Sequence, residues 1–183
     1  MLGVNLKFNM ILFNNNFLPR DKIENKILIL NESKTNNIIY GAQSIKKHVG
    51  FGSRPTQDFD IMTNNPKQMA EKTENNLEKF TPKNSFYVKK GLFPGLYKVK
   101  SIGPDKIKDT KDDITFVDYS KMHSPKPIST KIDNNNFRVL NEEKAAKLKA
   151  LKDDTQKFRH KKDRIDYNII KNQQKMNNIF RLF

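Results

Sequence analysis

Residues 58–62 alternate carboxylate and apolar side chains in the order Asp-Phe-Asp-Ile-Met. This period of two is that of a β-strand, in which successive side chains point to opposite faces of the sheet. Asp58 and Asp60 are therefore predicted to project from one face of a strand, while the apolar residues beside them turn toward a core. A chain with this segment needs a sheet that is covered on one face and accessible on the other.

A strand, a glycine turn and a helix are predicted just before this segment. Residues 37–40 are β-prone and end at Gly41, and residues 42–48 have the composition of a short helix. A loop rich in glycine then leads to Arg54 and the two aspartates. The start of a helix offers unpaired backbone N–H groups, which makes it a place where an anion can bind.

The remaining pattern favours an α+β fold, with a small mixed or antiparallel sheet flanked by helices and a C-terminal helical cap. Three consecutive strands after the helix over 66–80 are expected to form an antiparallel meander. The predicted elements are helices over 21–30 and 66–80, strands over 85–90, 96–102, 114–119 and 137–140, and C-terminal helices from 141 and over about 155–180.

The domain organisation predicted from these elements has four parts. They are an N-terminal extension (1–20), a core (21–120), a surface linker rich in Pro, Ser and Asn (121–136) and a C-terminal helical region (137–183). The apolar run in the extension, residues 10–13, is too short to span a membrane, and we expect this arm to contact a protein partner instead.

The charge of the chain is strongly unbalanced, with 35 Lys and Arg against 20 Asp and Glu, a formal net charge of +15. Such a balance favours polyanionic partners such as RNA or DNA, although the abundance of Lys, Asn and Ile is also what AT-rich codons produce. No cysteine is present, so disulfides and thiolate chemistry are excluded. We expect an intracellular, cytoplasmic protein, with the inside of a virion as the alternative location.

Asp58 and Asp60 are candidate metal ligands, because neighbouring carboxylates on one strand suit oxygen-preferring Mg²⁺. Asp118 ends an apolar strand and is the predicted third ligand, with Asp112 and Asp113 as nearby alternatives. Three such carboxylates can hold two Mg²⁺ ions, with Mn²⁺ as an alternative cofactor.

Two segments together resemble a known superfamily. Residues 40–45 (Tyr-Gly-Ala-Gln-Ser-Ile) and 54–61 (Arg-Pro-Thr-Gln-Asp-Phe-Asp-Ile) are similar to the glycine motif and the aspartate motif of the DNA polymerase β-like nucleotidyltransferases. The resemblance is strongest to the minimal and abortive-infection toxin branch. It implies that the backbone amides of Gly41 and Ala42 cradle a triphosphate, although Ala42 stands where the family usually has Gly or Ser.

The same resemblance implies roles for the other side chains of the site. The three aspartates 58, 60 and 118 would be catalytic and bind the metal ions, while Arg54 and Thr56 belong to the nucleotide-binding motif. Residues 147–151 and 159–166 are similar to the two C-terminal helical motifs of that branch. Here Lys147 and Lys162 would contact phosphate.

In those C-terminal motifs, Asp163 and Asp166 would orient the cationic side chains. The alternative interpretation of these charges is a solvated, salt-bridged helix face. The choice between the two depends on whether the charged side chains are buried.

The activity implied by the resemblance is Mg²⁺-dependent transfer of a nucleoside monophosphate from an NTP to a hydroxyl of RNA, a protein or a small molecule. Asp118 would help to deprotonate that hydroxyl. Two other hypotheses remain open: a catalytically inert protein of this fold that serves as a structural component of a viral particle or other large assembly, and a basic nucleic-acid-binding protein. Ala42 in the phosphate-binding turn is one motivation for the inert alternative.

Overall fold

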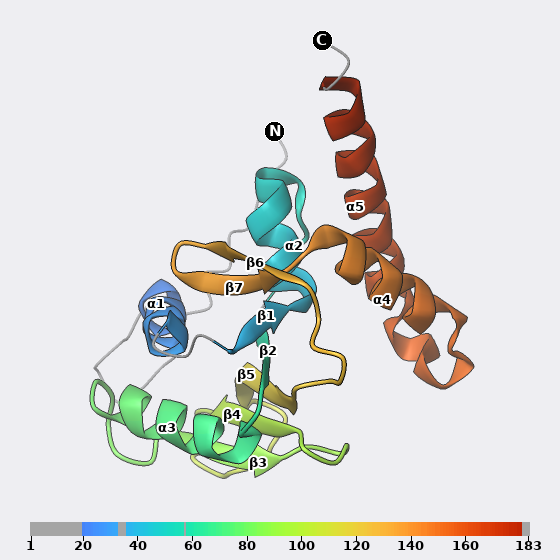
Figure 1. Cartoon of the computed structure of the whole chain (residues 1–183). Coiled ribbons are helices and arrows are strands. Elements are labelled where there is room, and N and C mark those ends of the chain that lie inside the picture. The colour runs from blue at the N-terminus through green and yellow to red at the C-terminus, as the bar shows by residue number, and fades with distance from the viewer. Residues whose placement is uncertain (1–19, 33–35, 57, 181–183) are drawn as a thin grey trace, which may run out of the picture.

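A computed structural model of the protein describes residues 20–32, 36–56 and 58–180. Its centre is a seven-stranded mixed sheet in the order β3-β4-β5-β2-β1-β7-β6 (Figure 1). The N-terminal arm predicted over 1–20 lies outside the described residues except for Arg20. The strands are β1 (Ile38–Tyr40), β2 (Phe59–Thr63), β3 (Phe86–Lys90), β4 (Tyr97–Ser101), β5 (Ile114–Lys121), β6 (Ser129–Ile132) and β7 (Asn135–Arg138).

Helices flank the sheet, and the last of them extends beyond the body of the molecule (Figure 1). The α+β architecture with C-terminal helices is therefore confirmed. The final helix begins later than the pattern predicts, because a 3₁₀ turn, in which the Asp153 side chain accepts a hydrogen bond from Thr155 N–H, precedes it. The helices are α1 (Arg20–Glu32), α2 (Gly41–Val49), α3 (Pro66–Glu78), α4 (Leu140–Lys152) and α5 (His160–Phe180), with 3₁₀ turns at Gly50–Gly52 and Asp154–Arg159.

Strand β2 lies in the middle of the sheet, and its two neighbours run in opposite directions. It is antiparallel to β1 and parallel to β5. The antiparallel meander predicted for the three strands after α3 is present, since β3 pairs with β4 and β4 with β5. Because β5 is the last strand of that meander, it returns to lie beside β2.

One face of the sheet carries the hydrophobic core, to which α1 and α3 contribute. Phe59 and Ile61 of β2 pack in a single buried cluster with Ile23 of α1 and with Met69 and Leu77 of α3. Burying a side chain of this size contributes about 1.5–3 kcal/mol. This burial fixes the orientation of β2, so the alternate residues of the strand must point to the opposite face.

The segment 121–136 differs from the surface linker expected there, because its second half forms part of the sheet. Strands β6 and β7 make a hairpin whose two turn residues, Asp133 and Asn134, have positive φ values of 44° and 63°. Strand β7 then pairs in parallel with β1, with Ile39 opposite Phe137. The C-terminal region therefore completes the same sheet.

A buried asparagine cluster fastens this hairpin to the rest of the fold. Asn31, at the end of α1, donates its amide to Asn135 Oδ1 at 2.7 Å and accepts from Asn37 Nδ2 at 3.0 Å. All three side chains are almost completely buried. Hydrogen bonds inside the protein offset the cost of removing these amides from water.

Candidate active site

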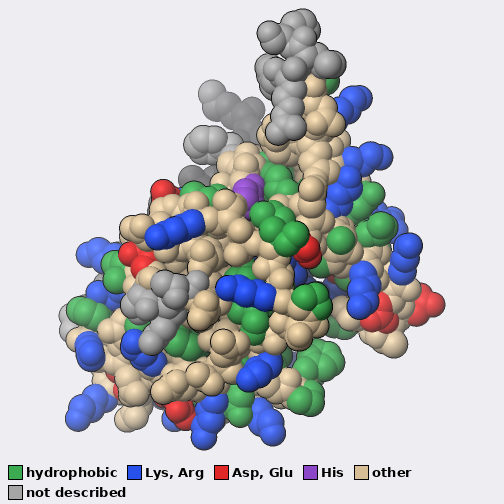
Figure 2. Space-filling model, viewed as in Figure 1, with side chains coloured by type: hydrophobic (Ala, Val, Ile, Leu, Met, Phe, Trp, Pro, Cys, Tyr) green, Lys and Arg blue, Asp and Glu red, His purple; other side chains and the backbone are tan. Residues whose placement is uncertain are grey.

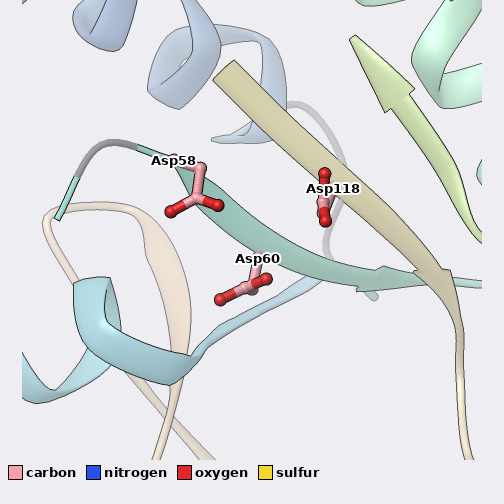
Figure 3. Close-up of side chains that lie close together, drawn as sticks. All are labelled: Asp58, Asp60 and Asp118. Carbon is pink, nitrogen blue, oxygen red and sulfur yellow. The ribbon is translucent and has the colours of Figure 1, made fainter. Parts of the chain in front are cut away.

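The three predicted aspartates are half-buried and converge on one face of the neighbouring strands β2 and β5 (Figure 3). Asp60 lies directly opposite Asp118 on the neighbouring parallel strand, and Asp58 immediately precedes β2. One carboxylate oxygen of each residue lies within 4.8 Å of those of the other two. The three side chains come together because β2 and β5 are in register and both bury their alternate residues in the core.

The neighbouring aspartates of the loop before β5 have other functions. Asp113 accepts hydrogen bonds from Tyr87 OH at 2.5 Å and from Gly103 N–H at 2.8 Å. Asp112 accepts from Thr110 Oγ1 at 2.6 Å. These contacts hold the loop together, so Asp118 is the carboxylate that the structure brings to the pair.

The electrostatics of the cluster favour the binding of a cation. Burial, together with the negative charges of Asp58 and Asp118, raises the pKa of Asp60 to about 7. Burial also raises the pKa of Asp118, although the Lys98 ammonium group opposes this rise. Three carboxylates at this separation repel one another unless positive charge lies between them or beside them.

These residues fit a hard divalent ion. Carboxylate oxygens are the ligands that Mg²⁺ and Mn²⁺ prefer, and three of them are close enough to share ions. Asp118 Oδ1 is buried and has no hydrogen-bond partner. Since an unpaired buried oxygen is costly, the geometry leaves a position at Asp118 that a cation would satisfy.

Gly41 lies against Asp60 and has a conformation that favours glycine. Its φ is +70°, and a Cβ atom at this position would lie 2.5 Å from Asp60 Oδ2. The Gly41 N–H group donates a hydrogen bond of 2.7 Å to Glu143 Oε1. The backbone amide that the resemblance assigns to a triphosphate is thus engaged by a carboxylate of α4 in this structure.

Glu143 itself is fully buried and paired with a cation. Arg138 binds both of its oxygens, through Nε at 2.9 Å and a terminal nitrogen at 2.7 Å. Burial raises the pKa of Glu143, and the Arg138 guanidinium acts in the opposite direction. Ala42 is also buried, beside Gly41 at the start of α2.

The aspartate motif is tied to the C-terminal helices. Thr56 Oγ1 donates to Asp58 Oδ1 at 3.3 Å. Arg54 contacts both carboxylate oxygens of Asp166 on α5, at 2.7 and 3.2 Å. This bidentate ion pair joins two segments that are far apart in the sequence, and it holds α5 beside the acidic cluster.

Lys147 lies in a buried ion cluster between α4 and α5. Its ammonium nitrogen is 2.9 Å from Asp163 Oδ1 and 3.0 Å from Asp166 Oδ2. Lys147 is 6% exposed and Asp166 is fully buried, so these charges do not form a solvated helix face. The Lys147 charge also opposes the rise that burial causes in the pKa of Asp60.

Lys162, the other lysine assigned to phosphate, differs from Lys147 in being exposed on α5. Arg159, at the end of the 3₁₀ turn before α5, is exposed as well. Burial raises the pKa of both Asp60 and Asp118, and the Arg159 charge opposes this rise. Arg159 is therefore an exposed cation whose charge acts on the acidic cluster.

Three residues of the site were not predicted. Glu143 looks in the sequence like an ordinary acidic residue of a first helical turn, and Arg138 like a strand residue. Lys98 lies opposite Asp118 on β4, and its Nζ atom is 2.5 Å from Asp118 Oδ2. The alternation of lysine with other residues in 97–101 predicts the face of the strand on which Lys98 lies. It does not reveal that Asp118 is the partner of Lys98.

Comparison with solved structures identifies the fold. The chain superposes on the Megavirus polyadenylate synthase with a TM-score of 0.65, at 10% identity, over 83% of this chain and 31% of that one. It is also similar to JHP933 from Helicobacter pylori (TM-score 0.47, 16% identity, 72% and 55% of the two chains) and to a candidate nucleotidyltransferase from H. pylori (0.46, 18%, 75% and 59%). No family model and no curated protein matches the sequence.

The fold and the site together define the class: this is a nucleotidyltransferase-like α+β fold with an acidic triad at the edge of two parallel strands. The chain spans about a third of the length of the Megavirus enzyme.

Among the described residues, no helix combines the length and the apolar character needed to cross a membrane.

Proposed function

We propose that this protein transfers a nucleoside monophosphate from an NTP to a hydroxyl group, with pyrophosphate as the leaving group. The observation that carries the proposal is the convergence of three carboxylates, with oxygens within 4.8 Å of one another, in a nucleotidyltransferase-like fold. Divalent ions, Mg²⁺ or Mn²⁺, are the proposed cofactors, and Asp58, Asp60 and Asp118 are the residues that would hold them.

The bound ions would neutralise the phosphates and the attacking oxygen, as in other phosphoryl-transfer sites. The protein's own residues position the reactants. Asp118 is the proposed acceptor of the hydroxyl proton, because it lies on the β5 side of the cluster, away from α2. On the other side, Arg54 and Lys147 hold α4 and α5 in place, and exposed Lys162 is the proposed contact for the NTP phosphates.

An RNA 3′ hydroxyl is the acceptor that the charges favour over a protein or a small molecule. The acidic residues Glu143, Asp163 and Asp166 of α4 and α5 are buried, whereas most basic residues of α5, unlike Lys147 of α4, are exposed. Figure 2 shows basic side chains along this part of the surface. The exposed cations of α5 and the preceding turn include Arg159, Lys161, Lys162, Arg164, Lys171 and Lys175.

Likeness to an enzyme named polyadenylate synthase adds a specific version of this proposal, in which ATP is the donor and adenylate is added to RNA. A surface on which exposed cations are concentrated attracts nucleic acid more strongly than the net charge of +15 alone indicates. The cytoplasm is the proposed location, with the virion as the alternative.

A second candidate function is a catalytically inert member of the fold with a structural or nucleic-acid-binding role in a large assembly. The hydrogen bond from Gly41 N–H to Glu143 favours it, because a carboxylate occupies the amide that would otherwise face phosphate. In this role the N-terminal arm, residues 1–19, would bind a protein partner. The two candidates differ in whether any NTP is consumed.

The test is a transfer assay with each of four α-labelled NTPs, Mg²⁺ or Mn²⁺, and RNA, protein or small-molecule acceptors. Label should pass to RNA with ATP for the wild-type protein and fall by about 10³-fold in Asp60→Asn, because the loss of a metal ligand removes several kcal/mol of charge stabilisation. Asp154→Asn makes the same change at an exposed residue and should transfer normally. Absence of transfer with every donor, metal and acceptor would support the inert alternative.

A further inference from the structure

Lys98 is the cation in direct contact with the acidic triad among the residues that the structure describes. Its Nζ atom lies 2.5 Å from Asp118 Oδ2, and the other oxygen of that carboxylate is buried without a hydrogen-bond partner. A cation therefore already pairs with one oxygen of Asp118, a carboxylate that lies within reach of the other two aspartates.

The contact is built into the sheet. Lys98 and Asp118 are directly opposite each other on antiparallel strands β4 and β5, so their side chains must project from the same face. The register shifts only beyond them, between Val99 and Lys100. Strand pairing on both sides of Lys98 thus determines which carboxylate its side chain can reach.

Neighbouring lysines on the same face have partners elsewhere. Lys89, directly opposite Lys98 on β3, contacts Asp109, and Lys100 lies 3.8 Å from Asp109 and 3.7 Å from Asp113. Both are therefore directed toward the loop before β5. Lys98 alone of these three is directed at the triad.

We propose that the Lys98 ammonium group is an internal counter-cation of the triad, which neutralises Asp118 in the metal-free protein and is displaced when a divalent ion binds there. A lysine side chain can make this exchange, since its ammonium group is a point charge on a flexible four-carbon stem. The Lys98 side chain is 32% exposed, so it has solvent into which to move.

Competition between the two cations has a consequence for the order of binding. An ion that enters alone must displace Lys98 and remain close to its positive charge, which weakens the affinity for the ion. An NTP brings negative charge that offsets this repulsion. Lys98 thereby favours entry of the ion together with the nucleotide over entry of the ion alone.

This inference deepens the proposed function and rests on one part of it, that the triad binds a divalent ion. The test is Mn²⁺ binding to the full chain without NTP, measured by isothermal titration and by the electron paramagnetic resonance signal of free Mn²⁺. Lys98→Met should lower the dissociation constant about tenfold, because removal of one positive charge at contact distance from a ligand removes repulsion as well as competition. Lys98→Arg keeps the charge and should bind Mn²⁺ as the wild type does.

Lys89→Met is the matched control, because it removes the same charge from the adjacent strand and the same face without touching the triad. It should change the dissociation constant less than twofold, roughly the effect of a screened surface charge. Thermal denaturation gives a second readout: saturating Mn²⁺ should raise the midpoint more in Lys98→Met than in the wild type at equal ion concentration. A merely structural role for Lys98 does not produce tighter binding.

The outcomes separate this inference from the proposed function. If Mn²⁺ binds the wild type and an Asp58→Asn/Asp60→Asn variant equally, or binds neither, the triad is not a metal site and both proposals fail. If binding depends on the triad but Lys98→Met binds no more tightly than Lys89→Met, only the role of Lys98 is overturned.

Discussion

Gly41 lies against Asp60, whose carboxylate occupies the space that a side chain at position 41 would fill. A Cβ atom there would lie 2.5 Å from Asp60 Oδ2, and the φ of +70° is itself strained for any residue with a side chain. Because Gly41 has no side chain, it leaves room for the Asp60 carboxylate, whether or not a phosphate also binds there.

Gly41→Ala is predicted to destabilise the protein and to displace Asp60. The backbone strain costs about 1–2 kcal/mol, and the clash with the carboxylate adds to it. Gly50→Ala is a matched control, because Gly50 has a φ of +74° and nothing lies within 4 Å of its added Cβ atom. Urea unfolding should show a larger loss for Gly41→Ala, and Mn²⁺ binding should weaken only in that variant. Equal losses in both measurements would contradict the role of the Gly41–Asp60 contact.

The metal-free protein is predicted to lose stability as the pH rises toward neutrality. The pKa of Asp60 is raised from 3.8 to about 7. Between these values the folded state binds a proton that the unfolded state has released, so the free energy of unfolding falls as pH increases through this window. In EDTA, the wild type should lose about 2–3 kcal/mol more than Asp60→Asn between pH 5 and pH 7.5.

Urea unfolding at the two pH values measures this difference directly. Asp154→Asn, at an exposed aspartate, should follow the wild type. A pH dependence that is the same with and without the Asp60 carboxyl group would show that its folded-state pKa is not raised.

The buried ion cluster of Lys147, Asp163, Asp166 and Arg54 is predicted to be critical for the position of α5. Asp166→Asn removes the negative charge that lies 2.7 Å from Arg54 and 3.0 Å from Lys147. Since it leaves buried positive charge without its partner, the expected cost is about 3–5 kcal/mol. Asp154→Asn breaks an exposed ion pair with Lys157 and should cost less than about 0.5 kcal/mol. Similar denaturation midpoints for the two variants would refute the prediction.

Lys162 and Lys147 are predicted to affect function in different ways, although the resemblance assigns both to phosphate. Lys162 is exposed, so Lys162→Met should raise the KM for NTP about fivefold, the equivalent of about 1 kcal/mol, and leave the unfolding midpoint unchanged. Lys147→Met should lower that midpoint, because Asp163 and Asp166 lose their shared cation. Steady-state kinetics together with thermal denaturation distinguish these effects. An unchanged KM for Lys162→Met would remove this lysine from the nucleotide site.

Local sequence patterns predicted the parts of the site that depend on one or two elements. The alternation in residues 58–62 predicts which side chains of β2 are buried, and Gly41 between a strand and a helix predicts the sharp turn. The strand predicted over 137–140 overlaps β7, but its hairpin partner β6 was missed because Ser129–Ile132 is a polar edge strand with little apolar alternation. The pair Asp133-Asn134 was its local signal, since these residue types tolerate the positive φ that a two-residue hairpin turn requires.

Contacts between distant segments could not be predicted in the same way. Glu143 and Gly41 are 102 residues apart, and their hydrogen bond exists only because α4 packs against α2. Lys147 looks like any lysine of a basic helix until α5 covers it. Burial decides whether such a charge is solvated or held in an ion cluster, and burial is a property of the packed structure.

The sequence by itself determined that Asp58 and Asp60 share one face of a strand, because the side-chain period of a strand is a local property of the backbone. The sequence predicted Asp118 as the third carboxylate, with Asp112 and Asp113 as alternatives. Only the tertiary structure decided that Asp118 joins the pair and that Lys98 is its partner. Both depend on the order and the register of β2, β5 and β4, which are set by the apolar residues that the sheet buries beneath α1 and α3. A shift of one residue in either pairing would turn these side chains to the opposite face.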